Sequence, residues 1–301
     1  MKRTWSKLGF LCLIGLCISC SSEIITDDAV QPTKQAISWV PYIAREVQTR
    51  AAVMDNGQLK TTGFGIMGYV HTGSPDYATP NFMNGQVTWD DSNSQWSYSP
   101  TKYWPNNASQ RLDFLAYAPY NDATHILVSG SNLTFTVDED PTKQVDLIVA
   151  TAKNQTRSNN NGAVALHFRH LLSRLQFDAK AAAGYDYEIT FTSATLSNAP
   201  TEGTFNPWTG EWTITPGTGS NTVSSSTDYL LLIPGSTDGI IATIHYTLSG
   251  SERSQEITIS NVLPALEAGR SYKISLIGAK DDIIFDVEAV ENWNEDTTQN
   301  E

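Results

Sequence analysis

Short runs in which apolar and polar residues alternate recur along most of this chain, and this period-two pattern restricts its fold more than any other feature. The runs are rich in Val, Ile, Thr, Tyr and Phe and are separated by Gly, Pro, Asn and Asp, as is typical of antiparallel strands and turns. The sequence therefore predicts an all-β protein. The clearest predicted strands are residues 63–70, 112–117, 132–137, 175–179, 187–191, 229–233, 240–248, 257–259, 272–276 and 283–287.

Helical periodicity is nearly absent, and only the short segments 143–150 and 179–183 could form helix. Two pairs of predicted strands are close enough in sequence to form antiparallel hairpins. Residues 87–89 precede residues 95–98, and residues 203–206 precede residues 211–214, with an aromatic residue on each strand and turn-forming residues between them.

All three cysteines lie within the first twenty residues. A basic start is followed by an apolar run at residues 8–18 and by small residues, which is the order of a secretory signal. The run is too short to span a bilayer comfortably. Because Cys20 directly follows small and apolar residues, the segment resembles a bacterial lipoprotein signal, although Cys17 stands where that motif usually has Leu. We expect removal of residues 1–19 and lipidation of Cys20; a plain cleaved signal and an uncleaved anchor are the alternatives.

Size, charge and thiol content limit what the rest of the chain can be. With no cysteine after Cys20, the mature part can form no intramolecular disulfide, so packing and hydrogen bonds must stabilise it. The formal net charge of −13 opposes binding to phosphate backbones, so nucleic acid is not an expected partner. About 280 residues remain after the signal, more than one hydrophobic core usually serves, which predicts two domains.

The composition divides the chain into five predicted segments. The domain boundary follows the Asn-rich loop at 154–162, because the strand pattern resumes in a new register near Leu171. The segments are a signal peptide at 1–19, a flexible tether at 20–36, an N-terminal β domain at 37–170, a C-terminal β domain at 171–293 and a polar tail at 294–301.

No residue pattern in the sequence indicates catalysis, a cofactor or a metal. Gly-x-Ser-x-Gly, phosphate-binding and His-Glu-x-x-His motifs are absent. The acidic runs at 138–140 and 281–282 lack the alternating ligands of a calcium loop and are expected to be solvated turns. We expect His170, near Arg174, to be a hydrogen-bonded structural residue. The histidines lack ligand partners at metal-binding spacing; they are His71, His125, His167, His170 and His245.

Aromatic residues gather between positions 89 and 104, namely Trp89, Trp96, Tyr98, Tyr103 and Trp104. Sugar-binding proteins stack pyranose rings on exposed Trp and Tyr, so a glycan-binding outer-membrane surface lipoprotein that does not polymerise is an alternative function. Aromatic residues that alternate along strands more commonly pack in a core. Solvent exposure distinguishes the two: coplanar, accessible rings favour a sugar platform, and burial favours core packing.

Several motifs occur in an order that resembles the fimbrillin family, which comprises lipoprotein-derived pilins and related surface proteins. The likeness covers residues 37–293, and its strength lies in the ordered set rather than in any one motif. The motifs are Trp96-Ser97-Tyr98, Lys102-Tyr103-Trp104-Pro105, residues 112–119, residues 166–177, Gly203-Thr204-Phe205 with Trp212, residues 231–235, residues 268–272, and Val290 with Trp293.

This resemblance implies two antiparallel β-sandwiches in tandem, of the transthyretin-like fimbrillin type. It also implies a lipid-anchored precursor of a fimbrial, or pilus, subunit that reaches the outer membrane and supports adhesion. An Arg-specific protease would remove the first strand, and a strand from another fimbrial subunit would fill the groove, which is β-augmentation. The expected partners are therefore other subunits, the membrane through the lipid, and that protease.

The implied cut lies between Arg50 and Ala51, with Arg45 as the second choice. Alternatively, Arg50 merely ends a surface strand. The apolar residues from Ile37 to Ile43 alternate loosely enough to form the removable strand. The donated strand would be 283–290 or its predecessor, and the sequence leaves open whether the subunit belongs to the stalk or the tip.

Overall fold

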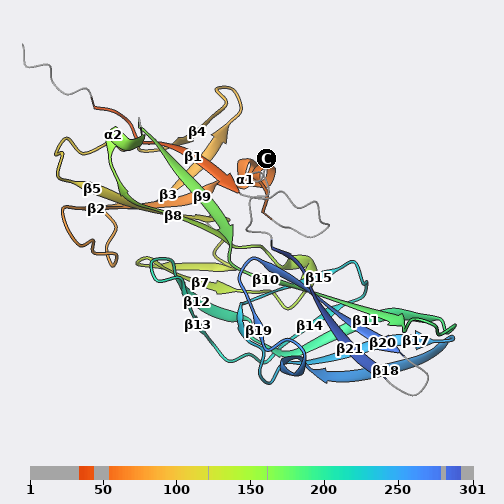
Figure 1. Ribbon diagram of the computed structural model, residues 1–301. Coiled ribbons are helices and arrows are strands. Elements are labelled where there is room, and N and C mark those ends of the chain that lie inside the picture. The colour runs from red at the N-terminus through yellow and green to blue at the C-terminus, as the bar shows by residue number, and fades with distance from the viewer. Residues whose placement is uncertain (1–33, 44–53, 121, 161, 279–282, 293–301) are drawn as a thin grey trace, which may run out of the picture. The chain divides into compact units, whose positions relative to one another are not determined.

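The computed structural model describes residues 34–43, 54–120, 122–160, 162–278 and 283–292 (Figure 1). Strands dominate these residues, as the sequence predicts. The first ten strands are β1 (Ser38–Ile43), β2 (Phe64–His71), β3 (Phe82–Asp90), β4 (Gln95–Tyr98), β5 (Arg111–Ala118), β6 (Ile126–Ser129), β7 (Asn132–Thr136), β8 (Ile148–Gln155), β9 (Ala163–His170) and β10 (Ser173–Ala181).

The remaining strands all follow residue 188. They are β11 (Ile189–Ala199), β12 (Glu202–Asn206), β13 (Glu211–Ile214), β14 (Gly219–Val223), β15 (Tyr229–Leu232), β16 (Gly235–Ser236), β17 (Ile241–Leu248), β18 (Ser251–Thr258), β19 (Ala265–Leu266), β20 (Arg270–Gly278) and β21 (Ile283–Asn292). The helices are short; they are α1 (Asn56–Thr62), α2 (Arg157–Asn160) and the 3₁₀ turns η1 (Pro141–Lys143) and η2 (Ile259–Asn261).

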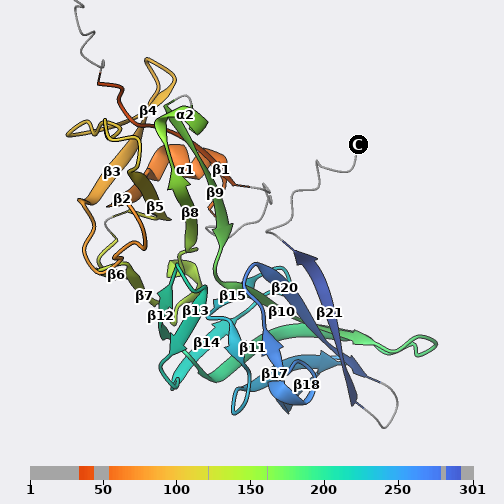
Figure 2. The ribbon, with the colours of Figure 1, turned by 60° about the vertical axis from the view of Figure 1, so that its left-hand side comes forward.

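Strands from the first half form a seven-stranded sheet in the order β1-β9-β8-β5-β2-β3-β4. Rings from strands far apart in this order nevertheless meet: Trp39 of β1 lies 5.0 Å from Phe114 of β5, and Phe64 of β2 lies 5.5 Å from Phe168 of β9. The sheet therefore curves so that the β1–β9 ribbon faces the other strands across a core, which we call the first core. The two views of the ribbon show β1 beside β9 along this edge (Figure 2).

Strands from the second half form a sandwich of two four-stranded sheets, β15-β10-β20-β21 and β14-β11-β17-β18. Their inward side chains enclose the second core. Phe177, Leu196, Ile244 and Ile274 contribute to it, and none of them has exposed surface. Alternation of inward apolar and outward polar residues is what a two-layer β structure requires.

A third sheet, β13-β12-β7-β6, combines strands from both halves of the sequence. Phe205 of β12 is opposite Leu133 of β7, and both are buried in a core with Tyr69 and Leu231. The predicted boundary between residues 170 and 171 falls between β9 and β10, which belong to different sheets. However, β7 precedes this boundary and β12 follows it, and the two strands pair with each other. The division into two domains therefore stays a prediction.

Both predicted hairpins are confirmed. Trp89 is opposite Trp96 in the β3–β4 pair, and Phe205 is opposite Trp212 in the β12–β13 pair. Neither of the two segments that could form helix is an α-helix. Segment 143–150 runs from η1 into β8, whose first residues are buried, and segment 179–183 begins inside β10.

Candidate functional site

Strand β1 occupies the edge of the seven-stranded sheet and, within the described residues, pairs only with β9. The pairing is parallel and runs from Ser38 opposite Ala163 to Ile43 opposite Phe168. Pro41 lies within β1 and has no N–H to donate, which an edge strand tolerates better than a central strand. The sequence therefore predicted the strand correctly, and its composition suits a strand with one free side.

The inner face of β1 is apolar and closes the first core. Ile37, Trp39 and Ile43 are at most 4% exposed. The Trp39 ring lies 5.7 Å from the Tyr98 ring and 5.0 Å from the Phe114 ring. Burial of such side chains contributes roughly 1.5–3 kcal/mol each. Loss of β1 would expose this part of the core to water.

Hydrogen bonds fix the beginning of β1 to two neighbouring loops. The Ile37 N–H donates to the Lys102 carbonyl oxygen at 2.9 Å, and the Tyr98 hydroxyl donates to the Ile37 carbonyl oxygen at 2.8 Å. The Ser38 N–H and hydroxyl both donate to the Gly162 carbonyl oxygen, at 2.9 and 3.1 Å. Tyr98 therefore supports β1 by a hydrogen bond as well as by ring packing.

Strand β9 depends on β1 for most of its strand pairing. Within the described residues, β9 matches β8 only where Ile148 is opposite His170 and Val149 is opposite Arg169. The rest of β9 is paired along its length with β1. Because buried backbone groups need partners, removal of β1 would leave β9 strongly under-bonded.

The predicted cleavage residues Arg45, Arg50 and Ala51 lie outside the described residues, but both flanks of that segment are described. The Ile43 N–H donates to Asn56 Oδ1 at 3.1 Å, and Asn56 Nδ2 donates to the Ile43 carbonyl oxygen at 3.2 Å. This reciprocal pair ties the end of β1 to the first residue of α1.

A buried carboxylate holds the other flank. The Met54 N–H donates to Asp146 Oδ2 at 3.1 Å, and the same oxygen lies 2.6 Å from His170 Nδ1. Asp146 and His170 are at most 1% exposed. His170 is therefore a hydrogen-bonded structural residue, as expected, but no pattern in the sequence identified Asp146 as its partner.

The C-terminal strand β21 also lies at a sheet edge. It pairs antiparallel with β20, from Arg270 opposite Asn292 to Gly278 opposite Ile283. Phe285 and Val287 pack against the second core but are only half-buried, and Ile284 is 58% exposed.

The five aromatic residues proposed as a glycan platform do not form one exposed surface. Trp104 is buried, whereas Trp96 and Tyr98 are half-buried against the first core. Trp89 is half-buried under Lys60, whose Nζ lies 4.3 Å from the ring centroid, and it meets Trp96 edge-on at 68°. Tyr103 is 49% exposed. This geometry favours core packing for Trp96, Tyr98 and Trp104, whereas Trp89 packs against Lys60 and Trp96.

The predicted lipidation residue, Cys20, lies outside the described residues. In the described ranges, His, Cys, Asp and Glu side chains form no cluster of three or more suited to a metal ion. None of the helices in that part of the chain has the length and hydropathy needed to cross a bilayer.

These observations define an all-β protein in which the edge strand β1 completes a core and pairs in parallel with β9. Residues 49–293 match the fimbrillin-like family, and the chain belongs to that family. No curated protein matches the sequence.

Solved structures share the fold at low sequence identity. A fimbrial protein from Bacteroides vulgatus superposes with a TM-score of 0.61 at 21% identity, covering 86% of this chain and 99% of that one. A candidate cell adhesion protein from Bacteroides uniformis gives 0.59 at 23% identity, with the same coverage. A fimbrial assembly protein from Parabacteroides distasonis gives 0.51 at 9% identity, covering 85% of this chain and 96% of that one. The fold is therefore of the fimbrillin type.

Proposed function

We propose that this protein is the precursor of a fimbrial subunit, anchored to the outer membrane through a lipid on Cys20 and polymerised by protease-triggered strand exchange. It acts as a structural, non-enzymatic component that supports adhesion at the cell surface. Membership of the fimbrillin-like family supports the fimbrial role and the surface location. The anchor, the cut at Arg50 and the exchange are our proposals.

One observation carries the proposal: the strand that precedes the expected cut is a sheet edge whose inner side chains complete a core. Ile37, Trp39 and Ile43 are buried, and β9 has little other strand pairing in the described residues. A subunit without β1 would have an apolar groove beside an unpaired strand. Main-chain hydrogen bonds and side chains from an incoming strand would satisfy both.

The contacts on either side of the cut suggest that cleavage and strand loss are separate steps. After a cut behind Arg50, Asn56 would still hold Ile43, and Asp146 would still hold Met54 in the retained part. The cut therefore allows β1 to leave without expelling it. A competing strand then displaces β1 instead of adding to an already empty groove, which limits exposure of apolar surface.

We propose β21 as the donated strand. It lies at the end of the described chain and at a sheet edge, and its side chains at 283 and 284 are exposed. Exchange of such a ladder gives kinetic stability, because dissociation must break many hydrogen bonds together. The non-polymerising glycan-binding alternative lacks an exposed aromatic platform among the residues first considered for it.

The proposal is tested by treating the purified protein with an Arg-specific protease, sequencing the new N-terminus and running unheated, non-reducing gels. We expect a new terminus at Ala51 and a ladder of oligomers. The Arg50→Lys variant should give no ladder, whereas Arg45→Lys should behave like the parent. A product that starts at Ala51 and stays monomeric, even at high concentration, would contradict strand exchange.

A further inference from the structure

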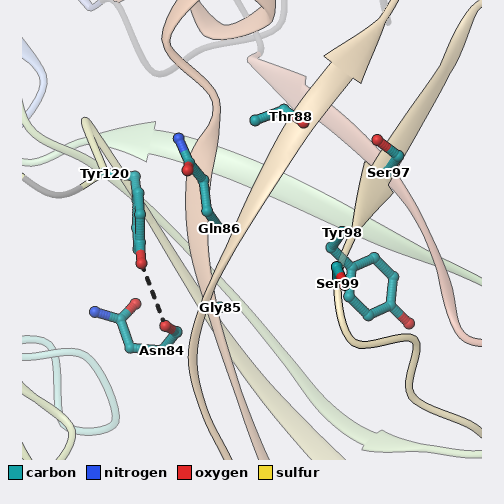
Figure 3. Close-up of a pocket in the computed structure, with 8 residues that line it drawn as sticks. All are labelled: Asn84, Gly85, Gln86, Thr88, Ser97, Tyr98, Ser99 and Tyr120. Carbon is teal, nitrogen blue, oxygen red and sulfur yellow. Dashed lines mark hydrogen bonds between the residues drawn. The ribbon is translucent and has the colours of Figure 1, made fainter.

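A polar groove lies on the outer face of the β3–β4 hairpin, with a volume of about 510 Å³ (Figure 3). Pockets that hold small ligands typically span about 300–1,000 Å³. Most of the side chains that line the groove are uncharged hydrogen-bonding groups. The lining residues are Asn84, Gly85, Gln86, Thr88, Ser97, Tyr98, Ser99 and Tyr120.

Strand alternation explains why this face is polar. Val87 of β3 is buried in the first core, so its neighbours Gln86 and Thr88 project to the opposite face and are exposed. Thr88 is opposite Ser97 of β4, which brings hydroxyls of both strands to the same side. The hairpin thus separates an aromatic inner face from a carboxamide- and hydroxyl-rich outer face.

Packing beneath the groove holds one carboxamide in place. Asn84 Nδ2 donates to the Tyr117 hydroxyl at 2.6 Å. Gly65 permits this approach, because a Cβ there would lie 2.6 Å from the Tyr117 ring and 2.8 Å from Asn84 Oδ1. Among the described residues, Asn84 Oδ1 is buried without a hydrogen-bond partner. A buried acceptor of this kind is costly unless a ligand or water satisfies it.

One aromatic ring forms a side of the groove. Tyr120 is half-buried, and its hydroxyl donates to the backbone carbonyl oxygen of Asn84 at 3.5 Å. Figure 3 shows this bond as a dashed line. This contact orients the ring beside the polar side chains of β3. The Tyr98 hydroxyl, by contrast, is bonded to the Ile37 carbonyl oxygen.

The lining identifies the chemistry of a ligand. It contains no Asp, Glu, Lys or Arg, and the chain's net charge of −13 disfavours anions. Carboxamides and hydroxyls donate and accept at once, which matches ligands that carry many hydroxyls. An aromatic ring beside them offers an apolar surface for the C–H face of a sugar. We infer that the groove binds a short neutral oligosaccharide.

This site differs from the aromatic set indicated by the sequence, and it uses neither β1 nor β21. The experiment therefore uses the uncleaved full-length chain. Saturation-transfer difference NMR measures binding of lactose, N-acetyllactosamine and maltotetraose, with 3′-sialyllactose as the charged comparison. At least one neutral probe should bind, and it should bind more tightly than 3′-sialyllactose.

Three variants connect binding to the groove. A Gln86→Ala, Ser97→Ala double variant should weaken binding at least fivefold, and Tyr120→Ala should do the same while Tyr120→Phe retains binding. Gln95→Ala is the matched control, because Gln95 lies on the same hairpin outside the groove and is exposed. Thermal unfolding verifies that each variant is folded. No signal from any neutral probe, tighter binding of 3′-sialyllactose, or unchanged binding by the folded double variant would each overturn the inference.

Discussion

Strands β1 and β21 both lie at sheet edges, but they are attached in different ways. β1 is short, and its inner side chains are almost fully buried around Trp39. β21 has a longer ladder, while Phe285 and Val287 are only half-buried and Ile284 is largely exposed. Side-chain burial thus dominates the attachment of β1, whereas backbone pairing dominates over side-chain burial in residues 283–287 of β21.

This difference suits complementary roles in the proposed exchange. A strand held by burial leaves an apolar groove when it departs, so its loss strongly favours binding of a replacement strand. A strand held by its ladder can form equivalent hydrogen bonds with another sheet edge, because main-chain pairing has little sequence specificity. We therefore expect substitutions of buried residues in β1 to lower the free energy of unfolding more than substitutions in β21 do.

The largest expected effect is that of Trp39→Ala. Removal of a buried aromatic side chain costs about 3–5 kcal/mol of the free energy of unfolding. Phe285→Ala should cost less than about 2 kcal/mol, because its side chain is half-buried. Urea denaturation measures both, and Val40→Ala on the exposed face of β1 is the control. Equal losses for Trp39→Ala and Phe285→Ala would refute the contrast between the two strands.

Asp146→Ala tests the contact that holds the retained side of the cut. The substitution leaves the Met54 N–H and buried His170 without their acceptor, so we expect a loss of about 3 kcal/mol. Asp122→Ala is the matched control, because Asp122 lies 2.8 Å from His125 in a more exposed pair. Asp122 also accepts from the Thr124 and His125 N–H groups, so that variant should lose about 1–2 kcal/mol. Similar losses in both variants would indicate that burial of the Asp146–His170 pair does not increase its contribution to the free energy of unfolding.

Asn56→Ala tests the contact at the other flank. Two hydrogen bonds to Ile43 disappear, which should cost about 1–2 kcal/mol. After cleavage by an Arg-specific protease, β1 should dissociate faster from this variant, as size-exclusion chromatography and mass spectrometry would detect. Asn56→Asp keeps the acceptor for the Ile43 N–H and should give an intermediate effect. Unchanged dissociation in Asn56→Ala would show that this pair does not retain β1.

The sequence predicted local strand patterns better than long-range pairing. The alternation in β1 and the turn residues of both hairpins act between near neighbours, so the sequence carries them directly. The parallel partner of β1 lies more than a hundred positions away, beyond any local pattern. The reciprocal Asn56–Ile43 bonds and the Asp146–His170 pair likewise depend on tertiary placement.

The two segments that could form helix contain strand residues instead, and α1 was missed, for local physical reasons. Ile148 and Val149 are both buried although they point to opposite faces of β8, and such a strand resembles a buried helix in its apolar run. Ala179 lies in β10 opposite Leu276 of β20, so strand pairing overrides the helix propensity of alanine. Helix α1 was missed because it is short and buries only Leu59, although Asp55 caps it by accepting from the Gln58 N–H.

The smallest expected effect concerns alkaline pH. Burial raises the pKa of Tyr98 above its ordinary value near 10, and the pKa of Tyr272 is raised for the same reason. The neutral phenol therefore stabilises the fold at pH values below the unfolded pKa, and that contribution is lost as the pH rises through the folded pKa. The two residues differ in their bonds. The Tyr98 hydroxyl donates to the Ile37 and Lys102 carbonyl oxygens and accepts from the Lys102 N–H, whereas the Tyr272 hydroxyl accepts from the Glu267 N–H.

A phenolate can still accept a hydrogen bond but can no longer donate one, so rising pH should loosen β1 before it loosens β21. Hydrogen exchange followed by mass spectrometry, corrected for the intrinsic pH dependence of exchange, compares peptides covering residues 37–43 and 283–292. Tyr98→Phe should cost about 1 kcal/mol at neutral pH, since it removes the bonds that the hydroxyl donates to the Ile37 and Lys102 carbonyl oxygens and the one that it accepts from the Lys102 N–H. It should also remove the alkaline loosening of β1. Parallel loosening of both strands, or a pH response of β1 that persists in Tyr98→Phe, would mean that Tyr98 does not control the first strand.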